Sequence, residues 1–358
     1  MLKSLFLENF RNYQKYSLNF QKTTIIVGPN GAGKTNILEA IYLLSAGRSW
    51  RTNYDREVVR WGSPLARISA KLENQKDFTI EMAILKEPRP DIPQLKIIKI
   101  NHLKKKLTDL LGKMPAVLFS PEEIQMVEGP PALRRRFLDI LLCQVDKKYT
   151  LALLDLGKII RGRNRLLYYI KIGRSKVGEL AFWDEKLVAL GSFIIRKRQK
   201  LLGAMNLNLS QIYGEISGNN ESFNLKYKQT VAPENFRGVL ESQRAREIEN
   251  TATLFGPHRD DLVFLLENKD ITTFGSRGEY RSAILALKIA ELEFLRSEVE
   301  TEPILLLDDI FSELDKTRRS HLGKLIAGQQ TIITTTDLDH IERGLRGEAK
   351  VVELAKTD

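Results

Sequence analysis

Polar and apolar residues alternate along much of the first 120 residues. Segments 66–72, 78–82 and 95–100 place apolar side chains at every second position, which is the period of strands with one buried face. Segments 2–7 and 24–27 are shorter apolar runs. We therefore expect a lobe of antiparallel strands in this part of the chain.

The period becomes helical from about residue 121 to residue 250. Leu151, Leu154 and Ile159 recur at helical spacing, and so do Leu187 and Ile194. Beyond residue 251, segments 304–307 and 331–334 are continuous apolar runs, typical of buried strands in a parallel sheet. The pattern predicts a helical region between two regions that contain strands.

Segment 28–35 matches the phosphate-loop pattern G-x-x-x-x-G-K-[ST] in full. An apolar run precedes it and an amphipathic helical pattern follows it, as a phosphate loop requires. Backbone N–H groups of such a loop point at phosphate oxygens, while Lys34 neutralises β- and γ-phosphate charge and the Thr35 hydroxyl binds Mg²⁺. The sequence thus predicts ATP and Mg²⁺ as cofactors. The predicted nucleotide-binding residues are Gly28, Pro29, Asn30, Gly31, Ala32, Gly33, Lys34 and Thr35.

Two carboxylates, Asp308 and Asp309, follow the apolar run 304–307. The carboxyl end of a strand is where doubly wound sheets bind ligands, so we expect Asp308 to hold Mg²⁺. Asp309 is the candidate to polarise the attacking water, and Lys34 and Asp309 are the expected catalytic residues. An ordinary acidic turn is the alternative.

Lys34 and Asp308 lie 274 positions apart. Compact kinases and GTPases bring these two motifs much closer together, so a large insertion separates them here. We expect an α/β fold in which residues 1–120 and 251–358 form one split ATPase domain. Residues 121–250 then form an inserted helical domain.

A third motif precedes the acidic strand. Ser276-Arg277-Gly278-Glu279 comes before a helical pattern and resembles the signature motif of ATPases of the ABC type, which close as dimers. Ser276 and Gly278 at a helix N-terminus would bind the γ-phosphate held by the opposite subunit. A plain helix N-cap is the alternative interpretation.

Together with these motifs, several blocks resemble the RecF family of bacterial replication and repair ATPases over nearly the whole chain. These blocks are residues 5–13, 119–123, 129–131, 134–139 and 256–261. The resemblance implies an ABC-type head related to Rad50 and SMC proteins, with an antiparallel β lobe and a compact helical arm. It also implies a weak DNA-dependent ATPase in which ATP drives homodimerisation on double-stranded DNA near single-strand gaps. RecR and RecO are the implied partners, and together they promote RecA loading.

Two departures from the family pattern stand out. The signature of the family usually ends in glutamine, whereas Glu279 would bring negative charge close to the γ-phosphate. Many ABC-type ATPases carry a histidine after the strand that follows the acidic motif, but this chain has Thr334-Thr335-Thr336 there.

Positive charge is concentrated in one segment. Residues 131–200 contain 17 Lys and Arg against 6 Asp and Glu, whereas the rest of the chain has 39 of each. We expect sequence-independent, salt-sensitive contacts with DNA phosphates, although a solvated helical face or a protein-binding surface would have the same composition. Tyr149 and Tyr168 could stack on bases or pack in a core. The candidate DNA contacts are Arg134, Arg135, Arg136, Lys147, Lys148, Arg161, Arg163 and Arg165.

The composition excludes several other classes. A single cysteine, Cys143, rules out an internal disulfide framework and favours the cytoplasm, and the four histidines lack metal-ligand spacing. No stretch approaches the about 18–20 apolar residues of a membrane helix, so we expect no membrane partner. The large insertion and the excess of basic residues do not suit the compact ATPase subunit of a transporter. A nuclease-coupled or SMC-like ABC ATPase is the remaining alternative.

Overall fold

The computed structural model describes residues 1–73, 78–88, 95–326, 328–341 and 343–355. The chain forms two compact units. Unit 1 comprises Met1–Ile124, Glu215–Gly218 and Ile284–Asp358, and unit 2 comprises Gln125–Gly214 and Asn219–Ala283.

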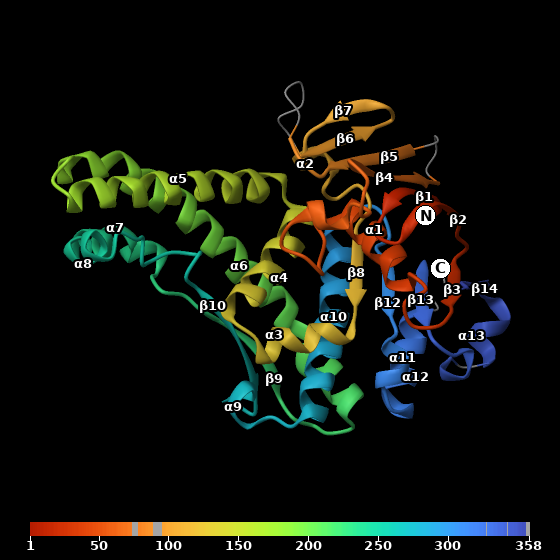
Figure 1. The fold of residues 1–358 in the computed structure, drawn as a ribbon. Helices are drawn as coiled ribbons and strands as arrows, with labels where there is room; N and C mark the ends of the chain where they lie inside the picture. The colour runs from red at the N-terminus through yellow and green to blue at the C-terminus, as the bar shows by residue number, and fades with distance from the viewer. Residues whose placement is uncertain (74–77, 89–94, 327, 342, 356–358) are drawn as a thin grey trace. The chain divides into compact units, whose positions relative to one another are not determined.

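Unit 1 contains a six-stranded antiparallel sheet in the order β2-β1-β4-β5-β6-β7 (Figure 1). Leu5 and Leu7 of β1 lie opposite Ala70 and Ile68 of β4, and all four side chains are buried. This alternation confirms the expected antiparallel lobe. The strands are β1 (Leu2–Phe10), β2 (Tyr13–Asn19), β4 (Leu65–Leu72), β5 (Phe78–Leu85), β6 (Lys96–Ile100) and β7 (Leu103–Lys105).

A five-stranded parallel sheet, in the order β14-β3-β13-β12-β8, forms the second layer of unit 1. Its strands are β3 (Thr23–Val27), β8 (Ala116–Phe119), β12 (Ile304–Asp308), β13 (Thr331–Thr335) and β14 (Lys350–Glu353). Helix α1 (Lys34–Ala46) contacts strands of both sheets and is buried along most of its length. The other helices of unit 1 are α2 (Leu107–Leu110), α11 (Ile310–Glu313), α12 (Lys316–Ile326) and α13 (Arg343–Glu348).

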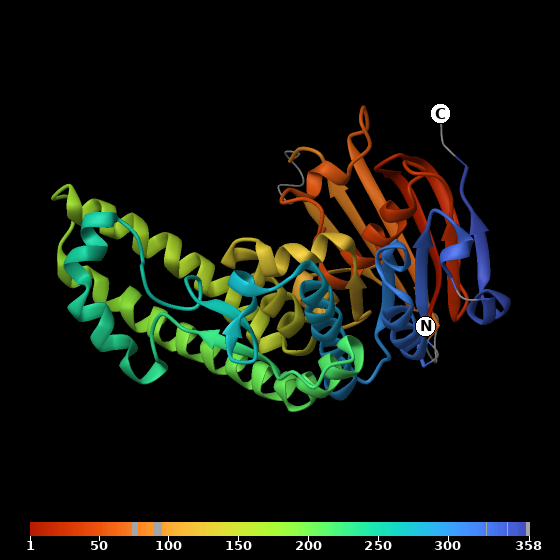
Figure 2. The same ribbon diagram turned by 90° about the horizontal axis from the view of Figure 1, so that it is seen from below.

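Unit 2 is mainly helical. Figure 2 shows its two long helices, α5 and α6, side by side, and Leu167 and Leu180 are buried between them. The helices are α3 (Gln125–Glu128), α4 (Pro131–Val145), α5 (Lys147–Lys171), α6 (Leu180–Ser217), α7 (Phe236–Ser242), α8 (Arg244–Asn250) and α9 (Ile271–Phe274). Helix α10 (Arg277–Glu298) begins in unit 2 and ends in unit 1.

Unit 2 also contains a small antiparallel sheet, which the helical periodicity of residues 121–250 did not predict. It has the order β11-β10-β9, with β9 (Phe223–Lys228), β10 (Asp261–Leu266) and β11 (Lys269–Asp270). Because β9 pairs with β10 along its whole length, the residues that follow Asn250 pack with unit 2 as far as Ala283. The division by packing therefore differs from the expected limit of the helical domain at residue 250.

Candidate nucleotide-binding site

The phosphate loop of unit 1 connects β3 to α1, as the sequence predicts. Gly31 and Gly33 have positive φ angles of 85° and 98°, a conformation that side-chain-bearing residues rarely adopt. A Cβ atom at Gly33 would lie 2.6 Å from the Tyr13 hydroxyl and 2.7 Å from Asn12 Nδ2. Glycine is therefore required at Gly33 by both backbone angle and close packing.

Lys34 is enclosed at the start of α1. Its Nζ donates hydrogen bonds to the carbonyl oxygens of Gly28 and Pro29, at 2.7 and 3.1 Å. Burial lowers the pKa of Lys34, and the carboxylates of Asp309 and Asp308 oppose this shift. The ammonium group thus lies against its own loop. On nucleotide binding it can donate to phosphate oxygens in place of these carbonyl oxygens.

Asp308 lies at the carboxyl end of β12, on a face shared with two hydroxyl groups. Its Oδ1 accepts from Thr35 Oγ1 at 2.9 Å and from Thr334 Oγ1 at 2.7 Å. A carboxylate beside a hydroxyl offers the hard oxygen ligands that Mg²⁺ prefers. The residues present therefore fit a Mg²⁺ ion, with Thr35 and Asp308 as the groups that would hold it.

Asp309 follows in a left-handed conformation, with φ of 50°. Its backbone N–H donates to the Thr334 carbonyl and hydroxyl oxygens, at 3.2 and 3.1 Å, which fixes the direction of the side chain. Its Oδ1 is buried with no hydrogen-bond partner among the described residues. Burial raises the pKa of Asp309, with Lys34 opposing the shift and Asp308 adding to it. A carboxylate oxygen in this state is suited to accept a proton from water.

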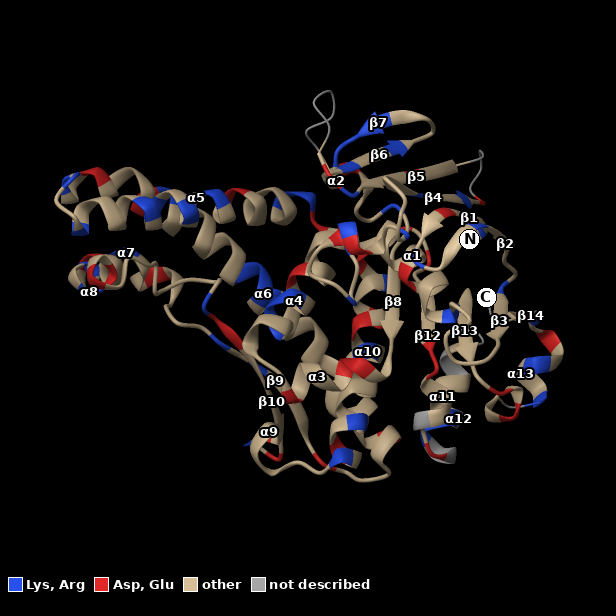
Figure 3. Cartoon of the chain, in the orientation of Figure 1, with Lys and Arg blue, Asp and Glu red and all other residues tan. Residues whose placement is uncertain are grey.

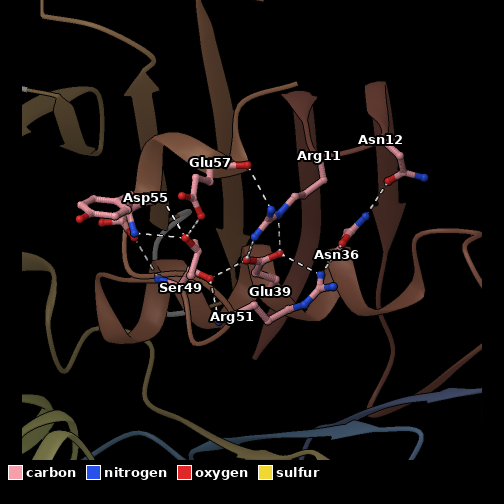
Figure 4. Close-up of polar contacts among 10 residues, drawn as sticks. Arg11, Asn12, Asn36, Glu39, Ser49, Arg51, Asp55 and Glu57 are labelled. Atoms are coloured by element: carbon pink, nitrogen blue, oxygen red, sulfur yellow. Dashed lines mark hydrogen bonds and ion pairs between the residues drawn. The ribbon is translucent and has the colours of Figure 1, made fainter. Parts of the chain in front are cut away.

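A second polar cluster supports the phosphate loop and was missed from the sequence except as part of a family block (Figure 4). Glu39 of α1 is fully buried. It accepts from Arg11 Nε at 2.9 Å, from Arg51 Nη1 at 3.3 Å and from the Ser49 hydroxyl at 2.5 Å. Asn36 links this cluster to the loop. Its Oδ1 accepts from Arg51 Nη1 at 2.8 Å, and its Nδ2 donates to Asn12 Oδ1 at 2.8 Å. Asn12 Nδ2 in turn donates to the carbonyl oxygen of Ala32 in the loop, at 3.4 Å. The available signal was the single glutamate within the otherwise uncharged, largely apolar segment 37–44 of α1.

The signature-like motif belongs to unit 2, where it starts α10. The Ser276 N–H donates to Glu279 Oε2 at 2.5 Å, and the Glu279 N–H donates to Ser276 Oγ at 3.3 Å. These reciprocal bonds form a capping box. The carboxylate of Glu279 is therefore turned back onto its own helix terminus, an arrangement that the charge argument from sequence did not anticipate.

The structure corrects the expected DNA contacts at Arg134 and Arg163. Arg163 is fully buried, and its guanidinium group contacts Asp184 at 2.8 Å and Glu247 at 2.6 Å. Arg134 is 7% exposed and pairs with Asp261 at 2.8 Å. Both arginines serve the interior of unit 2, because their charges are already balanced there.

The other candidate cations fall into two groups. Arg135 and Arg136 are partly buried. The remaining four are exposed along α5, where Figure 3 shows cationic residues in blue at several places along the helix. These four are Lys147, Lys148, Arg161 and Arg165. Tyr149 is fully buried and belongs to the core, whereas Tyr168 is 50% exposed.

The described residues contain neither a membrane-spanning helix nor a cluster of metal ligands. None of the described helices is long and apolar enough to span a bilayer. Within the same residues, no group of three or more His, Cys, Asp or Glu side chains is arranged to hold a metal ion.

Comparisons with known proteins agree with this geometry. The profile of the RecF/RecN/SMC N-terminal domain matches residues 1–356. The DNA replication and repair protein RecF of Agathobacter rectalis is 37% identical over 99% of this chain and 98% of its own length. RecF of Bacillus cereus is 39% identical over 97% of this chain and 95% of its own length.

Solved structures extend the match to three dimensions. The recombination mediator RecF bound to ATP superimposes with a TM-score of 0.88 at 34% identity, covering 95% of this chain and 93% of that one. An SMC head domain from Pyrococcus furiosus gives a TM-score of 0.55 at 19% identity, covering 100% and 94%, and so shares the fold. The ABC-type head fold is thereby confirmed, and the chain belongs to the RecF family of DNA replication and repair proteins.

Proposed function

We propose that this protein binds ATP and Mg²⁺ in unit 1 and uses them to dimerise on double-stranded DNA near single-strand gaps. The observation that carries the proposal is the arrangement around Asp308. An enclosed lysine and two hydroxyl groups converge at the end of a phosphate loop with a buried oxygen of Asp309 that has no hydrogen-bond partner among the described residues. This set matches a triphosphate with its metal ion and has no evident purpose in packing.

Each residue has a distinct role in this proposal. Backbone N–H groups of the phosphate loop and Lys34 neutralise the phosphates. Mg²⁺, when bound, spreads the charge of the β- and γ-phosphate oxygens, and Thr35 and Asp308 hold it. Asp309 orients the attacking water and accepts its proton, aided by the raised pKa.

Hydrolysis is proposed to reset a closed dimer. Ser276 and Gly278 of one subunit would meet the γ-phosphate bound by the partner, as the family resemblance implies. The solved relative is described as a mediator of the RecFOR pathway. We accordingly propose RecR and RecO as partners in RecA loading, and the cytoplasm, which holds the chromosome, as the location. The helical region bounded by residues 121 and 250 remains the proposed inserted domain.

DNA is proposed to contact the exposed cations of α5. Lys147, Lys148, Arg161 and Arg165 lie on one helix and face solvent. Such residues bind phosphates without regard to sequence, and their binding weakens as salt rises. Arg135 and Arg136 stay in the proposed set as more enclosed members.

The test is fluorescence anisotropy of a labelled duplex, a gapped duplex and a matched single strand, with and without ATP and Mg²⁺, across a salt series. ATP-enhanced, salt-sensitive preference for the duplex and gapped forms supports the proposal. Binding that ignores ATP, or Lys34→Ala protein that still dimerises with ATP, contradicts it. The same samples, resolved on a denaturing gel, test the nuclease alternative, which requires cleaved DNA.

A further inference from the structure

Arg134 uses its guanidinium group to join two elements of unit 2. Nε and Nη2 donate to the two carboxylate oxygens of Asp261, at the start of β10, at 2.8 and 3.0 Å. Nη1 donates to the carbonyl oxygens of Met126 and Gly129, at 3.1 and 2.9 Å. These carbonyl oxygens lie at the carboxyl end of α3, so Arg134 caps this short helix and pairs with β10 at the same time.

Helix α9 packs against both of the elements that Arg134 joins. Its residues contact α3 and β10, and Ile271, its buried residue, is 2% exposed. Strand β11 holds the start of α9, because Asp270 pairs with Leu265 of β10. The position of α9 is therefore set by α3 and β10, and through them by Arg134.

A tightly packed junction joins α9 to the signature motif. A Cβ atom at Gly275 would lie 2.5 Å from Ile271 Cγ1 and 2.5 Å from Tyr280 Cε1. The Gly275 N–H donates to the Ile271 carbonyl at 2.7 Å, and the Tyr280 hydroxyl donates to the Thr272 carbonyl at 3.4 Å. Because Gly275 is closely packed between Ile271 of α9 and Tyr280 of α10, we expect the start of α10 to follow any shift of α9.

We propose that Arg134, paired with Asp261, is the positioning residue of the signature motif. It holds α3 and β10 so that α9 presents Ser276 and Gly278 in the orientation that a partner's γ-phosphate requires. Arg134 and Asp261 belong to the family blocks at residues 134–139 and 256–261, so in this proposal the two blocks act together to position the signature motif. The inference rests on the proposed function, because it assumes that the signature of one subunit completes the nucleotide site of the other.

The test measures two properties of each variant: nucleotide binding by its own phosphate loop, and ATP-driven dimerisation, which requires its signature motif. Arg134→Met keeps the length of the side chain but removes the pair and the cap, and Asp261→Asn is a milder second variant that leaves the cap in place. Arg246→Met, at an exposed position of α8, is the matched control for loss of an arginine in unit 2. Circular dichroism and the affinity for a fluorescent ATP analogue report whether each variant is folded.

Arg134→Met is expected to bind the analogue with affinity within about twofold of the unaltered protein, while ATP-driven dimerisation weakens about tenfold or more. Asp261→Asn is expected to show a smaller loss in the same direction, and Arg246→Met none. The inference is overturned if Arg134→Met dimerises normally with ATP, or if Arg134→Met and Asp261→Asn both lose analogue binding to the same degree as dimerisation.

A mixing experiment supplies the decisive readout. Lys34→Ala has a defective phosphate loop and an intact signature, so a mixed dimer with Arg134→Met contains one composite site in which both parts are sound. ATP-driven association and ATPase activity should both return on mixing, to the level reached by a benchmark mixture of Lys34→Ala with Ser276→Arg. A merely unfolded Arg134→Met protein would not recover.

The controls distinguish the two levels of failure. If the benchmark mixture recovers but the Arg134→Met mixture does not, the positioning role is wrong and the proposed function stands. If the benchmark mixture also fails while both variants bind DNA and are folded, the shared nucleotide site itself is wrong.

Discussion

Buried charge at the nucleotide-binding site of unit 1 differs from buried charge in the interior of unit 2. In unit 1, Lys34 Nζ donates to the carbonyl oxygens of Gly28 and Pro29, and Asp309 Oδ1 is buried without a hydrogen-bond partner among the described residues. In unit 2, Arg163 is matched by two carboxylates and a hydroxyl, those of Asp184, Glu247 and Thr253. The unmatched charges of the phosphate-loop site are available to a ligand, whereas matched charges, such as Arg163 in unit 2 and Glu39 in unit 1, hold the fold together. Burial alone therefore does not identify a site.

The largest expected effect is that of Asp309→Asn, which tests the unmatched carboxylate of unit 1. An amide cannot accept the proton of water as a carboxylate can, so hydrolysis is expected to slow by about 10²–10⁴-fold. ATP binding should persist, because Lys34, Thr35 and Asp308 are unchanged, and the closed dimer should accumulate. Single-turnover hydrolysis and light scattering with ATP measure the two effects. Unaltered hydrolysis would remove Asp309 from the catalytic role.

The second prediction concerns Arg163→Met, which removes a matched buried charge from unit 2. This change leaves the carboxylate of Glu247 buried without its cation and leaves Asp184 paired with Arg244, at 3.3 Å, so it is expected to destabilise unit 2 by about 3–5 kcal/mol. The probe is the fluorescence of Trp183 during urea unfolding, in protein whose Trp50 and Trp61 are replaced by Phe, so that only unit 2 reports.

Arg161→Met is the matched control, two positions earlier on the same helix. Arg161 is exposed, so its loss should change the stability of unit 2 by no more than about 0.5 kcal/mol. Equal destabilisation by the two changes would show that burial in this structure does not distinguish them.

The contrast explains what could be predicted from the sequence. The phosphate loop and the acidic strand are local patterns, so Lys34, Thr35 and Asp308 could be placed from the sequence alone. The number of arginines in a segment does not show which of them are buried in ion pairs, because their carboxylate partners lie far away in the sequence. Glu247 is 84 positions from Arg163, and Asp261 is 127 positions from Arg134. The β9–β10 pair was missed for the same reason, since pairing between distant segments decides whether a short alternating run becomes a strand.

A third prediction concerns the exposed cations. Replacing Lys147 and Arg161 together with Ala should reduce the slope of log affinity against log salt by about 0.9 for each phosphate that the protein no longer neutralises. Duplex binding should also weaken by about 1 kcal/mol for each of these phosphates, equally for all sequences. Anisotropy titrations at several salt concentrations measure both quantities. Lys269→Ala, at an exposed position on β11, is the control expected to leave the slope unchanged.

An unchanged slope in the double variant would contradict the assignment of α5 to DNA. The exposed cations would then be better explained as a protein-binding surface, which the composition of this segment also allows.

The smallest expected effect tests the interior of unit 2 through pH. His258 Nε2 lies 3.0 Å from the Thr253 carbonyl oxygen, and its Nδ1 is buried without a hydrogen-bond partner among the described residues. Burial lowers the pKa of His258 to about 4. From pH 6.5 down to pH 4 the unfolded chain binds a proton that the folded chain refuses, so stability present above pH 6.5 is lost as the pH falls. One proton limits this slope to about 1.4 kcal/mol per pH unit.

His258→Gln keeps a donor for the Thr253 carbonyl but cannot titrate. Its unfolding midpoint, followed by Trp183 fluorescence, should therefore depend less steeply on pH between 6.5 and 5 than that of the parent. Above pH 7 the two proteins should show parallel pH dependence, because His258 is neutral in both the folded and the unfolded chain. Equal slopes between pH 6.5 and 5 would mean that the folded protein accepts a proton at His258. The interior of unit 2 would then tolerate a buried positive charge that has no carboxylate partner of the kind that Arg163 has.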